Sequence, residues 1–331
     1  MTVLIHPSSY KDLEAITIES DSMAAQFLPS MGTNLCSLIY KPRPLEMLVQ
    51  RSGEAYRVAN FADDYVADGE CAGLDDMFPT IDRCFYEQYP WQGTPLPDHG
   101  EVWSIPWESS IDGDHVRFVT HGVRLPYRLE KSVTFVHSDT LHFTYRLTNL
   151  SAFDMDFLWA AHPMFVLEEG AELALPREVN RIVTALSSDG QLGGYGDEFA
   201  WPMAELTGGE MRDLRRIQPK AAGTMAKYYV KGRLSDGWCA LTYPTSNLTL
   251  TLAFPSEQVP YLGILPNEGG WQDLYNIFLE PATSSFDRPD VAKLRGECSI
   301  VPAHGTYEWY WDITVSEGSD IRAARAGLGA E

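Results

Sequence analysis

Hydrophobic and polar residues alternate with a period of two along several runs of this chain. Residues 141–148, 247–254 and 307–315 each place an apolar side chain at every second position, with mostly polar side chains between them. A period of two predicts strands with one face against a core, as in antiparallel sheets. The pattern therefore indicates an architecture built mainly from strands.

Turn signals separate several of the predicted strands. Asp112-Gly113-Asp114 follows one short apolar run and precedes another, and Ser138-Asp139 stands immediately before the run that begins at Leu141. Both arrangements predict β-hairpins. We therefore predict an all-β fold, a large antiparallel β-sandwich of many strands.

Helical patterns are few, and no linker divides the chain. The best helix candidates are residues 290–295 and residues 319–326. The stretch 186–209 is rich in glycine and acidic residues, which is typical of a surface insertion between strands. The expectation is a single domain over residues 1–331, with its core at about 15–315.

The charge balance narrows the class of partner. The chain has 46 acidic and 25 basic residues, for a net charge of −21. Binding to nucleic acid or to anionic membranes requires clustered Lys and Arg, so this composition argues against both. The charge is read mainly as a source of solubility, and neither nucleic acid nor an anionic membrane is predicted as a partner.

The cysteines and the N-terminus favour a cytoplasmic protein. Five cysteines are widely spaced and form no Cys-x-x-Cys pair, which suits a reducing compartment. The first residues show no basic segment followed by an apolar core, so no secretory signal is predicted. The longest apolar stretch, 157–167, is interrupted by His162 and Pro163 and is too short to span a bilayer.

Three titratable residues stand in contexts that favour chemistry. Glu280 follows the apolar run 276–279, where a strand would open into a loop and present a general base. The alternative is a strand-end glutamate that meets solvent or caps a backbone group. His162 interrupts a strongly apolar segment, so its ring must be hydrogen-bonded in a core or face a cavity. His99 lies in a predicted tight turn before a predicted strand over 101–107, as an exposed turn residue or as a donor to a substrate.

Common cofactor and metal motifs are missing. The sequence contains no His-x-His, His-x-x-x-His or His-Glu-x-x-His spacing for zinc. It also lacks the glycine-rich nucleotide-binding patterns and the Gly-x-Ser-x-Gly elbow. Two histidines distant in sequence and a glutamate could still form a metal site, but the local patterns predict no cofactor and no metal.

Three blocks, in this order, resemble the aldose 1-epimerase (galactose mutarotase-like) family. They are Pro97-Asp98-His99-Gly100-Glu101-Val102-Trp103, Phe157-Leu158-Trp159-Ala160-Ala161-His162-Pro163-Met164-Phe165, and Phe278-Leu279-Glu280-Pro281 followed by Pro289-Asp290. Each block alone is a weak signal, but the ordered set is fairly specific. The resemblance extends from about Glu14 to about Val315.

The resemblance implies a large antiparallel β-sandwich that binds a sugar, and it implies a mechanism. Glu280 would remove the proton of the anomeric hydroxyl, and His162 would protonate the ring oxygen. His99 would donate a second hydrogen bond near that oxygen. Acid–base chemistry of this type needs no cofactor.

Four further residues are candidates for contact with the sugar. Many members of the family carry an arginine before the first histidine, and Arg83 is the residue available here. Asp75 and Asp76 would accept hydrogen bonds from sugar hydroxyls, unless they are solvated loop acids. Trp271 would cover a ring face, unless it only packs against its own loop.

The sequence thus predicts a cytoplasmic isomerase, an aldose 1-epimerase that interconverts the anomers of a free aldose, as a monomer or homodimer. Three alternatives remain open: a non-catalytic carbohydrate-binding protein, a mutarotase of a modified or phosphorylated hexose, and a polysaccharide lyase or hydrolase on the same scaffold. A free aldose is favoured over a phosphorylated one because no cluster of arginines is evident.

Overall fold

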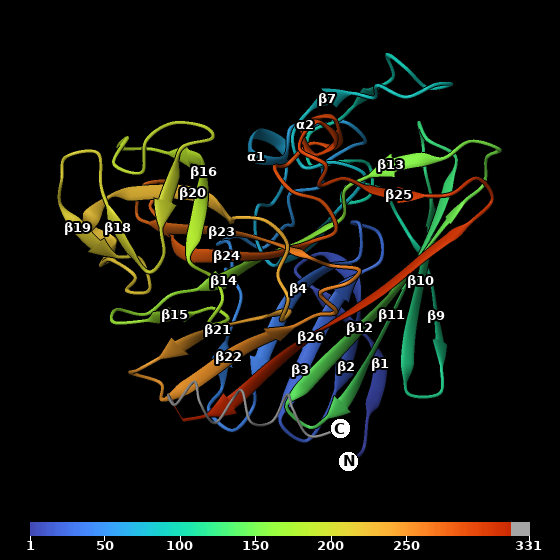
Figure 1. Cartoon of the computed structure of the whole chain (residues 1–331). Coiled ribbons are helices and arrows are strands. Elements are labelled where there is room, and N and C mark those ends of the chain that lie inside the picture. Colours follow the sequence, from blue (N-terminus) through green and yellow to red (C-terminus); the bar gives the residue numbers. More distant parts are fainter. Residues whose placement is uncertain (319–331) are drawn as a thin grey trace. The chain divides into compact units, whose positions relative to one another are not determined.

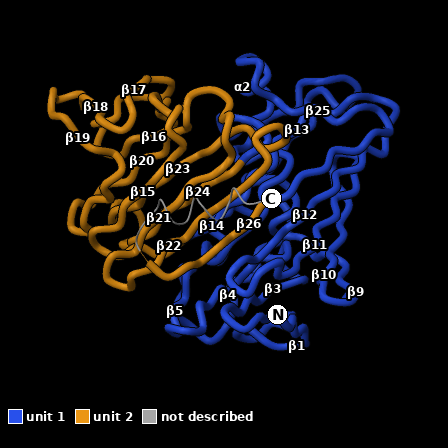
Figure 2. Tube along the Cα trace, turned by 60° about the horizontal axis from the view of Figure 1, so that its bottom comes forward, with its two compact units in different colours: residues 1–164, 282–310 blue, residues 165–281, 311–331 orange. Residues whose placement is uncertain are grey.

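The computed structural model describes residues 1–318, and strands predominate in that range (Figure 1). The chain divides into two compact units (Figure 2). The first comprises residues 1–164 and 282–310, and the second comprises residues 165–281 and 311–331. The single domain predicted from the sequence stays a prediction.

The first unit contains most of the elements. They are β1 (Leu4–Tyr10), β2 (Leu13–Glu19), β3 (Met23–Leu28), β4 (Asn34–Tyr40), β5 (Leu45–Glu46), α1 (Tyr65–Asp68), β6 (Leu74–Met77), β7 (Cys84–Phe85), β8 (Pro95–Leu96), β9 (Glu108–Asp112), β10 (His115–His121), β11 (Tyr127–His137), β12 (Thr140–Asn149), β13 (Met155–Phe157), α2 (Pro289–Leu294), β25 (Ser299–Val301) and the first residues of β14 (Ala160–Val166) and β26 (Thr306–Glu317).

Two antiparallel sheets enclose the core of the first unit. One has the order β1-β2-β3-β4-β6-β14, with β5 beside β4, and the other has the order β9-β10-β11-β12. Phe27 of the first sheet packs against Phe118 and Phe143 of the second, with ring centroids 5.7 and 6.3 Å apart. These aromatic side chains come from alternate positions of their strands, as the period of two requires.

The second unit contains the remaining elements. They are β15 (Glu172–Ala174), β16 (Arg181–Ser187), β17 (Glu198–Ala200), β18 (Met203–Glu205), β19 (Met211–Asp213), the 3-10 turn η1 (Lys220–Ala222), β20 (Thr224–Val230), β21 (Trp238–Tyr243), β22 (Leu248–Ala253), β23 (Tyr261–Glu268) and β24 (Tyr275–Ala282). One sheet has the order β24-β23-β20-β16-β17, and another contains β15-β21-β22-β26. Strands β18 and β19 pair with each other.

Most of the predicted elements are confirmed. The turns at 112–114 and 138–139 join the antiparallel pairs β9–β10 and β11–β12. The runs that begin near 141, 247 and 307 form β12, β22 and β26, and the helix predicted at 290–295 is α2. The helix predicted at 319–326 lies outside the described residues.

Two predictions are corrected. Residues 101–107 form no strand: Glu101 is fully buried and accepts hydrogen bonds from the Arg124 backbone N–H and the Tyr127 hydroxyl, both at 2.8 Å. The buried Glu101 carboxylate thus receives its hydrogen bonds from a backbone N–H and a hydroxyl group, and not within a strand ladder. The stretch 186–209 is largely exposed, yet it includes the short strands β17 and β18. Strands of three residues are too short for a period of two to be visible.

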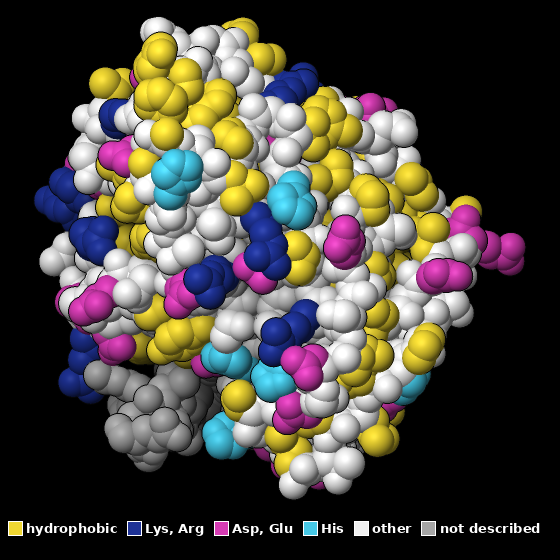
Figure 3. Space-filling model, turned by 90° about the vertical axis from the view of Figure 1, so that its right-hand side faces the viewer, with side chains coloured by type: hydrophobic (Ala, Val, Ile, Leu, Met, Phe, Trp, Pro, Cys, Tyr) yellow, Lys and Arg dark blue, Asp and Glu magenta, His cyan; other side chains and the backbone are white. Residues whose placement is uncertain are grey.

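Several surface properties bear on function. On the face shown in Figure 3, acidic, basic and apolar side chains are interspersed, and histidines reach the surface. Within residues 1–318, no helix is long and apolar enough to cross a membrane, and no three His, Cys, Asp or Glu side chains are grouped to hold a metal ion. All five cysteines are free thiols.

Candidate functional site

The two neighbouring strands β6 and β14 bring a predicted sugar-binding carboxylate, Asp75, beside the predicted general acid, His162. Asp75 and His162 are directly opposite each other in the antiparallel register of β6 and β14. Residues opposite each other in such a pair project to the same face of the sheet. Both residues are buried, with 5% of their surface exposed. The fold of the first unit therefore brings these two sequence-predicted residues together.

Two aromatic rings complete this group, and one of them was not predicted. The Tyr65 ring, at the start of α1, stacks on the His99 ring with centroids 4.0 Å apart and an angle of 14° between the planes. His162 makes an edge-to-face contact with each of these rings. Its ring centroid is 5.4 Å from that of Tyr65 and 5.1 Å from that of His99. We call Tyr65, Asp75, His99 and His162 the imidazole cluster.

The Asp75 carboxylate is held by neutral donors. Its Oδ1 accepts a hydrogen bond from Asn34 Nδ2 and its Oδ2 accepts one from the Tyr65 hydroxyl, both at 2.8 Å. Burial raises the pKa of Asp75 to about 6, although these two hydrogen bonds oppose the shift. A carboxyl group with this pKa changes its charge close to neutral pH, which is the range in which general acids and bases work.

The position of His99 is fixed by the backbone and by Asp98. His99 adopts a left-handed conformation with φ of 57°, and its Nδ1 lies 3.2 Å from Asp98 Oδ2. That carboxylate oxygen also accepts the Tyr65 backbone N–H at 2.8 Å. Burial raises the pKa of Asp98, but hydrogen bonds and nearby positive charge outweigh it and hold this pKa below its ordinary value. Asp98 therefore presents an ionised carboxylate to Nδ1 and directs the other ring nitrogen of His99 away from itself.

The residue after His99 has to be glycine. Gly100 has φ of 78°, and a Cβ atom at this position would lie 2.2 Å from the Phe78 carbonyl oxygen. No side chain fits that distance, so the His-Gly pair noted in the sequence has a steric cause. The side chain of His99 is 14% exposed, which makes it neither an open surface residue nor a fully enclosed one.

Asp76 does not share the face of Asp75, because adjacent residues of a strand point in opposite directions. Its Oδ2 lies 2.8 Å from Lys131 Nζ, in an ion pair whose side chains are both almost fully buried. Its Oδ1 accepts hydrogen bonds from the Tyr145 hydroxyl at 2.8 Å and from Trp159 Nε1 at 2.9 Å. Asp76 is thus a bonded core residue, and we correct its assignment as a sugar-binding acid.

Arg83 lies at the exposed end of α1. Its guanidinium donates to Asp64 Oδ2 at 2.8 Å, and its side chain is 59% exposed. Asp64 is the N-cap of α1, where its other oxygen accepts the Val66 and Ala67 backbone N–H groups. Arg83 is therefore linked to the imidazole cluster through the cap of the helix that carries Tyr65, and its charge also helps to lower the pKa of Asp98 beside His99.

The predicted base belongs to the second unit, where it lies inside a strand. Glu280 is within β24 and has no exposed surface. Its Oε2 is 2.8 Å from Nζ of Lys227 in β20, and the side chain of Lys227 is 9% exposed. This burial excludes the alternative of a solvent-facing strand-end glutamate. We call Glu280 and Lys227 the buried ion pair.

Trp271 lies in the turn between β23 and β24. Its backbone N–H donates to Asn267 Oδ1 at 2.9 Å, and its carbonyl accepts from Asn267 Nδ2 at 3.0 Å. These bonds fix the turn that leads into the strand of Glu280. The side chain is partly exposed, and a role in covering a sugar stays a prediction.

Sequence reasoning missed Tyr65, Asp98 and Lys227 as members of these groups. Lys227 carried a usable signal, because a lysine surrounded by apolar residues at 225–230 must find a partner when it is buried. Tyr65 carried a weaker one: an Asp before it predicts a helix start. Nothing local indicates that its ring stacks on a histidine 34 positions later.

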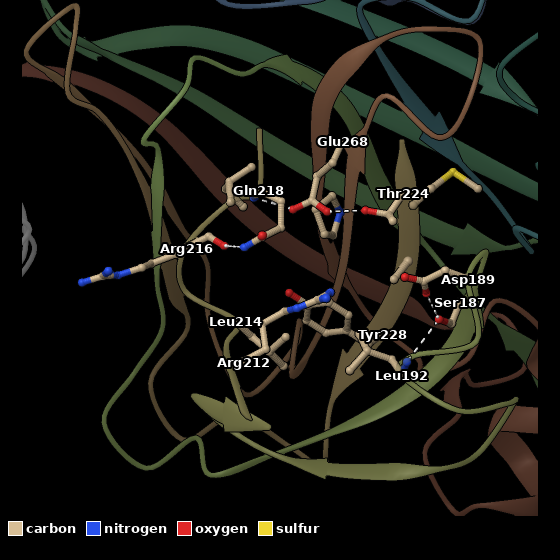
Figure 4. Close-up of a pocket in the computed structure, with 14 residues that line it drawn as sticks. Ser187, Asp189, Leu192, Arg212, Leu214, Arg216, Gln218, Thr224, Tyr228 and Glu268 are labelled. Atoms are coloured by element: carbon tan, nitrogen blue, oxygen red, sulfur yellow. Dashed lines mark hydrogen bonds between the residues drawn. The ribbon is translucent and has the colours of Figure 1, made fainter. Parts of the chain in front are cut away.

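The second unit also has a hollow, which none of the predicted site residues lines (Figure 4). Glu268 lines it, and its carboxylate accepts the Gln218 backbone N–H and the Thr224 hydroxyl, both at 2.7 Å. Burial raises the pKa of Glu268. Arg212 donates to Gln191 at 3.1 Å, and Arg216 extends outward. The polar groups of this hollow thus largely satisfy one another.

Comparison with known structures shows the fold. The chain resembles a galactose mutarotase-like protein from Clostridium acetobutylicum, with a TM-score of 0.67 and 14% identity over 95% of this chain and 99% of the other. A galactose mutarotase related enzyme from Lactobacillus acidophilus gives a TM-score of 0.65 and 14% identity, over 92% and 98% of the two chains. A galactose mutarotase-like protein from Lactobacillus casei gives 0.63 and 17%, over 91% and 100%.

These comparisons confirm the predicted fold class, the large antiparallel β-sandwich of galactose mutarotase-like proteins. The chain matches no protein-family model, and no curated protein sequence is significantly similar to it. The structural similarity establishes the fold, but at these low sequence identities the reaction has to be argued from the residues.

Proposed function

We propose that this protein is an aldose 1-epimerase that interconverts the α and β anomers of a free aldose. The observation that carries the proposal is the imidazole cluster, in which His99 and His162 converge with a carboxyl group whose pKa is about 6. Burying two imidazole rings beside a pair of strands costs free energy, because polar groups lose their contacts with water. They suit a reaction that consists only of proton transfers.

Glu280, His162 and His99 each have a defined part in the proposed reaction. Glu280 accepts the proton of the anomeric hydroxyl, and the electrons of that bond form the C1 carbonyl. The bond between C1 and the ring oxygen breaks, and His162 gives a proton to the ring oxygen. Rotation about the C1–C2 bond and reversal of the proton transfers close the ring as the other anomer. His99 donates a hydrogen bond near the ring oxygen.

A neutral sugar fits the imidazole cluster better than a phosphorylated one. The polar donors and acceptors described there are Tyr65, Asp75 and the two histidines, with Arg83 committed to Asp64. Carboxylates and imidazoles bind hydroxyl groups well, whereas a phosphate would require convergent arginines. We therefore propose a free aldose as the substrate.

Anomer exchange measured by NMR tests the proposal. A panel of free aldoses is exposed to the wild type, to Glu280→Gln and to Glu268→Gln, a matched loss of a buried glutamate from the neighbouring strand. We expect acceleration by the wild type and by Glu268→Gln, and a loss of about 10²–10⁴-fold in Glu280→Gln. Full activity in a folded Glu280→Gln protein would contradict the assignment of Glu280 as the base.

The buried ion pair also favours a second candidate, a carbohydrate-binding protein without catalysis. A carboxylate bonded to an ammonium group is a weaker base than one in a neutral pocket. This candidate predicts that sugars shift the NMR signals of the protein while their anomers exchange at the uncatalysed rate. The same experiment separates the two functions, because binding and exchange are observed in one sample.

A further inference from the structure

Lys227 contacts the proposed base, but the proposed reaction gives it no part. It projects from β20, and its Nζ is 2.8 Å from Glu280 Oε2, with side-chain exposures of 9% and 0% for the two residues. Nζ also lies 5.8 Å from the centre of the Tyr229 ring. Two contacts in a low-dielectric interior therefore define the position of this ammonium group.

The strand between β20 and β24 is built to leave room for this pair. Gly263 of β23 is opposite Tyr229 in the register of β20 and β23. A Cβ atom at Gly263 would lie 2.8 Å from Glu280 Oε2 and 3.3 Å from Tyr229 Cε1. Glycine weakens a strand interior, and it often marks a close approach of other groups. Here the absent side chain is what lets the carboxylate extend over β23 to reach Lys227.

The pair fixes both the charge and the direction of the carboxylate. A buried carboxyl group without a partner favours its neutral form, and an ammonium group within hydrogen-bond distance favours the ionised form. Lys227 of β20 faces the Glu280 carboxylate at 2.8 Å, and the Tyr229 ring of the same strand lies beside Gly263 of β23, the glycine that the carboxylate also approaches. Glu268 of β23 is bonded to Thr224 and Gln218 instead.

We propose that Lys227 is a positioning residue for the base of the reaction. It favours the ionised form of Glu280, and it holds Oε2 so that the carboxylate has one orientation. This inference rests on the proposed role of Glu280. It adds that the proton accepted by Glu280 is taken up by a carboxylate that remains beside an ammonium group, so that the acceptor is regenerated easily.

The test compares Lys227→Met with Lys227→Arg and with Lys231→Met. Lys231 follows the same strand and pairs with Glu198 at 2.7 Å, but it is 45% exposed, so its variant controls for loss of a lysine ion pair. For Lys227→Met we expect kcat to fall about tenfold or more with little change in KM, because a misplaced catalytic group affects the chemical step. The acid limb of the pH profile of kcat should move to higher pH.

Lys227→Arg should keep the position of that limb and most of kcat, and Lys231→Met should resemble the wild type. A Lys227→Met protein with wild-type kcat and pH profile overturns the inference. If Lys227→Met does not fold, Lys227→Gln decides in its place, because its amide donates to Oε2 without a charge. A wild-type pH profile in Lys227→Gln would equally overturn the inference, and an upward shift of the acid limb would support it.

The failure of the proposed function is distinguishable from the failure of this inference. If the wild type does not accelerate anomer exchange, the function fails first. The role of Lys227 is then read from the carboxyl-carbon NMR signal of Glu280, identified by its absence in Glu280→Gln. We expect this signal to titrate at higher pH in Lys227→Met than in the wild type. Identical titrations in the two proteins would overturn the positioning role whatever the activity.

Discussion

The imidazole cluster of the first unit and the buried ion pair of the second unit each contain a buried carboxyl group, but the two carboxyl groups have different partners. In the cluster, Asp75 is buried among neutral donors, and burial raises its pKa to about 6. In the pair, Glu280 is buried as deeply but has an ammonium group at 2.8 Å. Neutral hydrogen bonds leave a carboxyl group able to change its charge near neutral pH, whereas an ion pair holds the charge in place.

Because the two carboxyl groups have different partners, the two regions can contribute differently to proton transfer. A group that titrates near neutral pH is suited to share or adjust protons with the imidazoles beside it. A group held ionised is suited to accept a proton only when the substrate offers one in the right place.

The largest effect on stability is expected from breaking the buried ion pair. Glu280→Gln leaves the Lys227 ammonium buried without its carboxylate, so we expect a loss of about 3–5 kcal/mol in the free energy of unfolding. The double variant Glu280→Gln/Lys227→Met should recover much of that loss, because two neutral side chains replace two charges. Urea unfolding of the four proteins of this cycle gives the coupling energy.

The exposed pair Lys231–Glu198 serves as the matched control for that cycle. Its side chains are 45% and 38% exposed, so its coupling should be below about 1 kcal/mol. A coupling energy as small as this for Lys227 and Glu280 would contradict the contrast drawn between a fixed charge and a titrating one.

The next largest effect is a pH dependence that arises from Asp75. Because burial raises its pKa from 3.8 to about 6, the folded protein binds a proton there more tightly than the unfolded chain does. The free energy of unfolding should therefore fall as the pH rises from about 4 to about 6, by up to about 3 kcal/mol, and this contribution should be constant above pH 6.

Asp75→Asn removes the titration and should remove that fall. Urea unfolding of both proteins at a series of pH values gives the difference between the two curves, in which the contributions of other carboxylates cancel. Asp98→Asn is the informative control, because the pKa of Asp98 is lowered and its loss should change the slope in the opposite sense. Parallel curves for wild type and Asp75→Asn would show that Asp75 does not titrate in this range.

A smaller effect is expected from the donor that connects the ring stack to Asp75. Tyr65→Phe keeps the ring on His99 but removes the hydroxyl that donates to Asp75 Oδ2. We expect a loss of about 1 kcal/mol in the free energy of unfolding and a further rise in the pKa of Asp75. Thermal and urea unfolding measure the first, and the pH series described for Asp75 measures the second.

Tyr10→Phe is a suitable control, because the hydroxyl of Tyr10 bonds Gln50 in an exposed position. Its loss should change stability by less than about 0.5 kcal/mol. If Tyr65→Phe behaves like Tyr10→Phe, the hydroxyl of Tyr65 does not contribute to holding the carboxyl group.

The strand architecture was accessible from sequence because a period of two is a local signal. Positions 141–148 reveal an inward face without reference to any other part of the chain, and β12 follows directly from them. The roles of Asp75 and Asp76 were not accessible in the same way. The alternation of a strand separates the two side chains, but only the partners supplied by Lys131 and Tyr145 show which face is the core.

The candidate site shows the same limit. Their local contexts made Glu280 and His162 candidates, because a polar residue in an apolar run needs a partner, and the family resemblance supplied their predicted roles. Their partners come from other strands and loops, and pairings over such distances have no local signal. Lys227 shares the local anomaly of His162, yet its pairing with a glutamate 53 positions later required the fold.

The smallest effect is expected at Arg83, which tests whether the imidazole cluster extends to the surface. Its guanidinium is exposed and bonded to the N-cap Asp64, so Arg83→Ala should change the free energy of unfolding by less than about 0.5 kcal/mol. If Arg83 only supports α1, the KM for the sugar should rise less than about threefold in anomer-exchange kinetics, since Tyr65 remains capped by Asp64. Asp64→Ala separates the two roles, because it removes the cap and frees the guanidinium. A tenfold or larger rise in KM for Arg83→Ala with unchanged stability would instead make Arg83 a ligand of the sugar, as the family resemblance implies, and would place a positive charge among the groups that face the substrate.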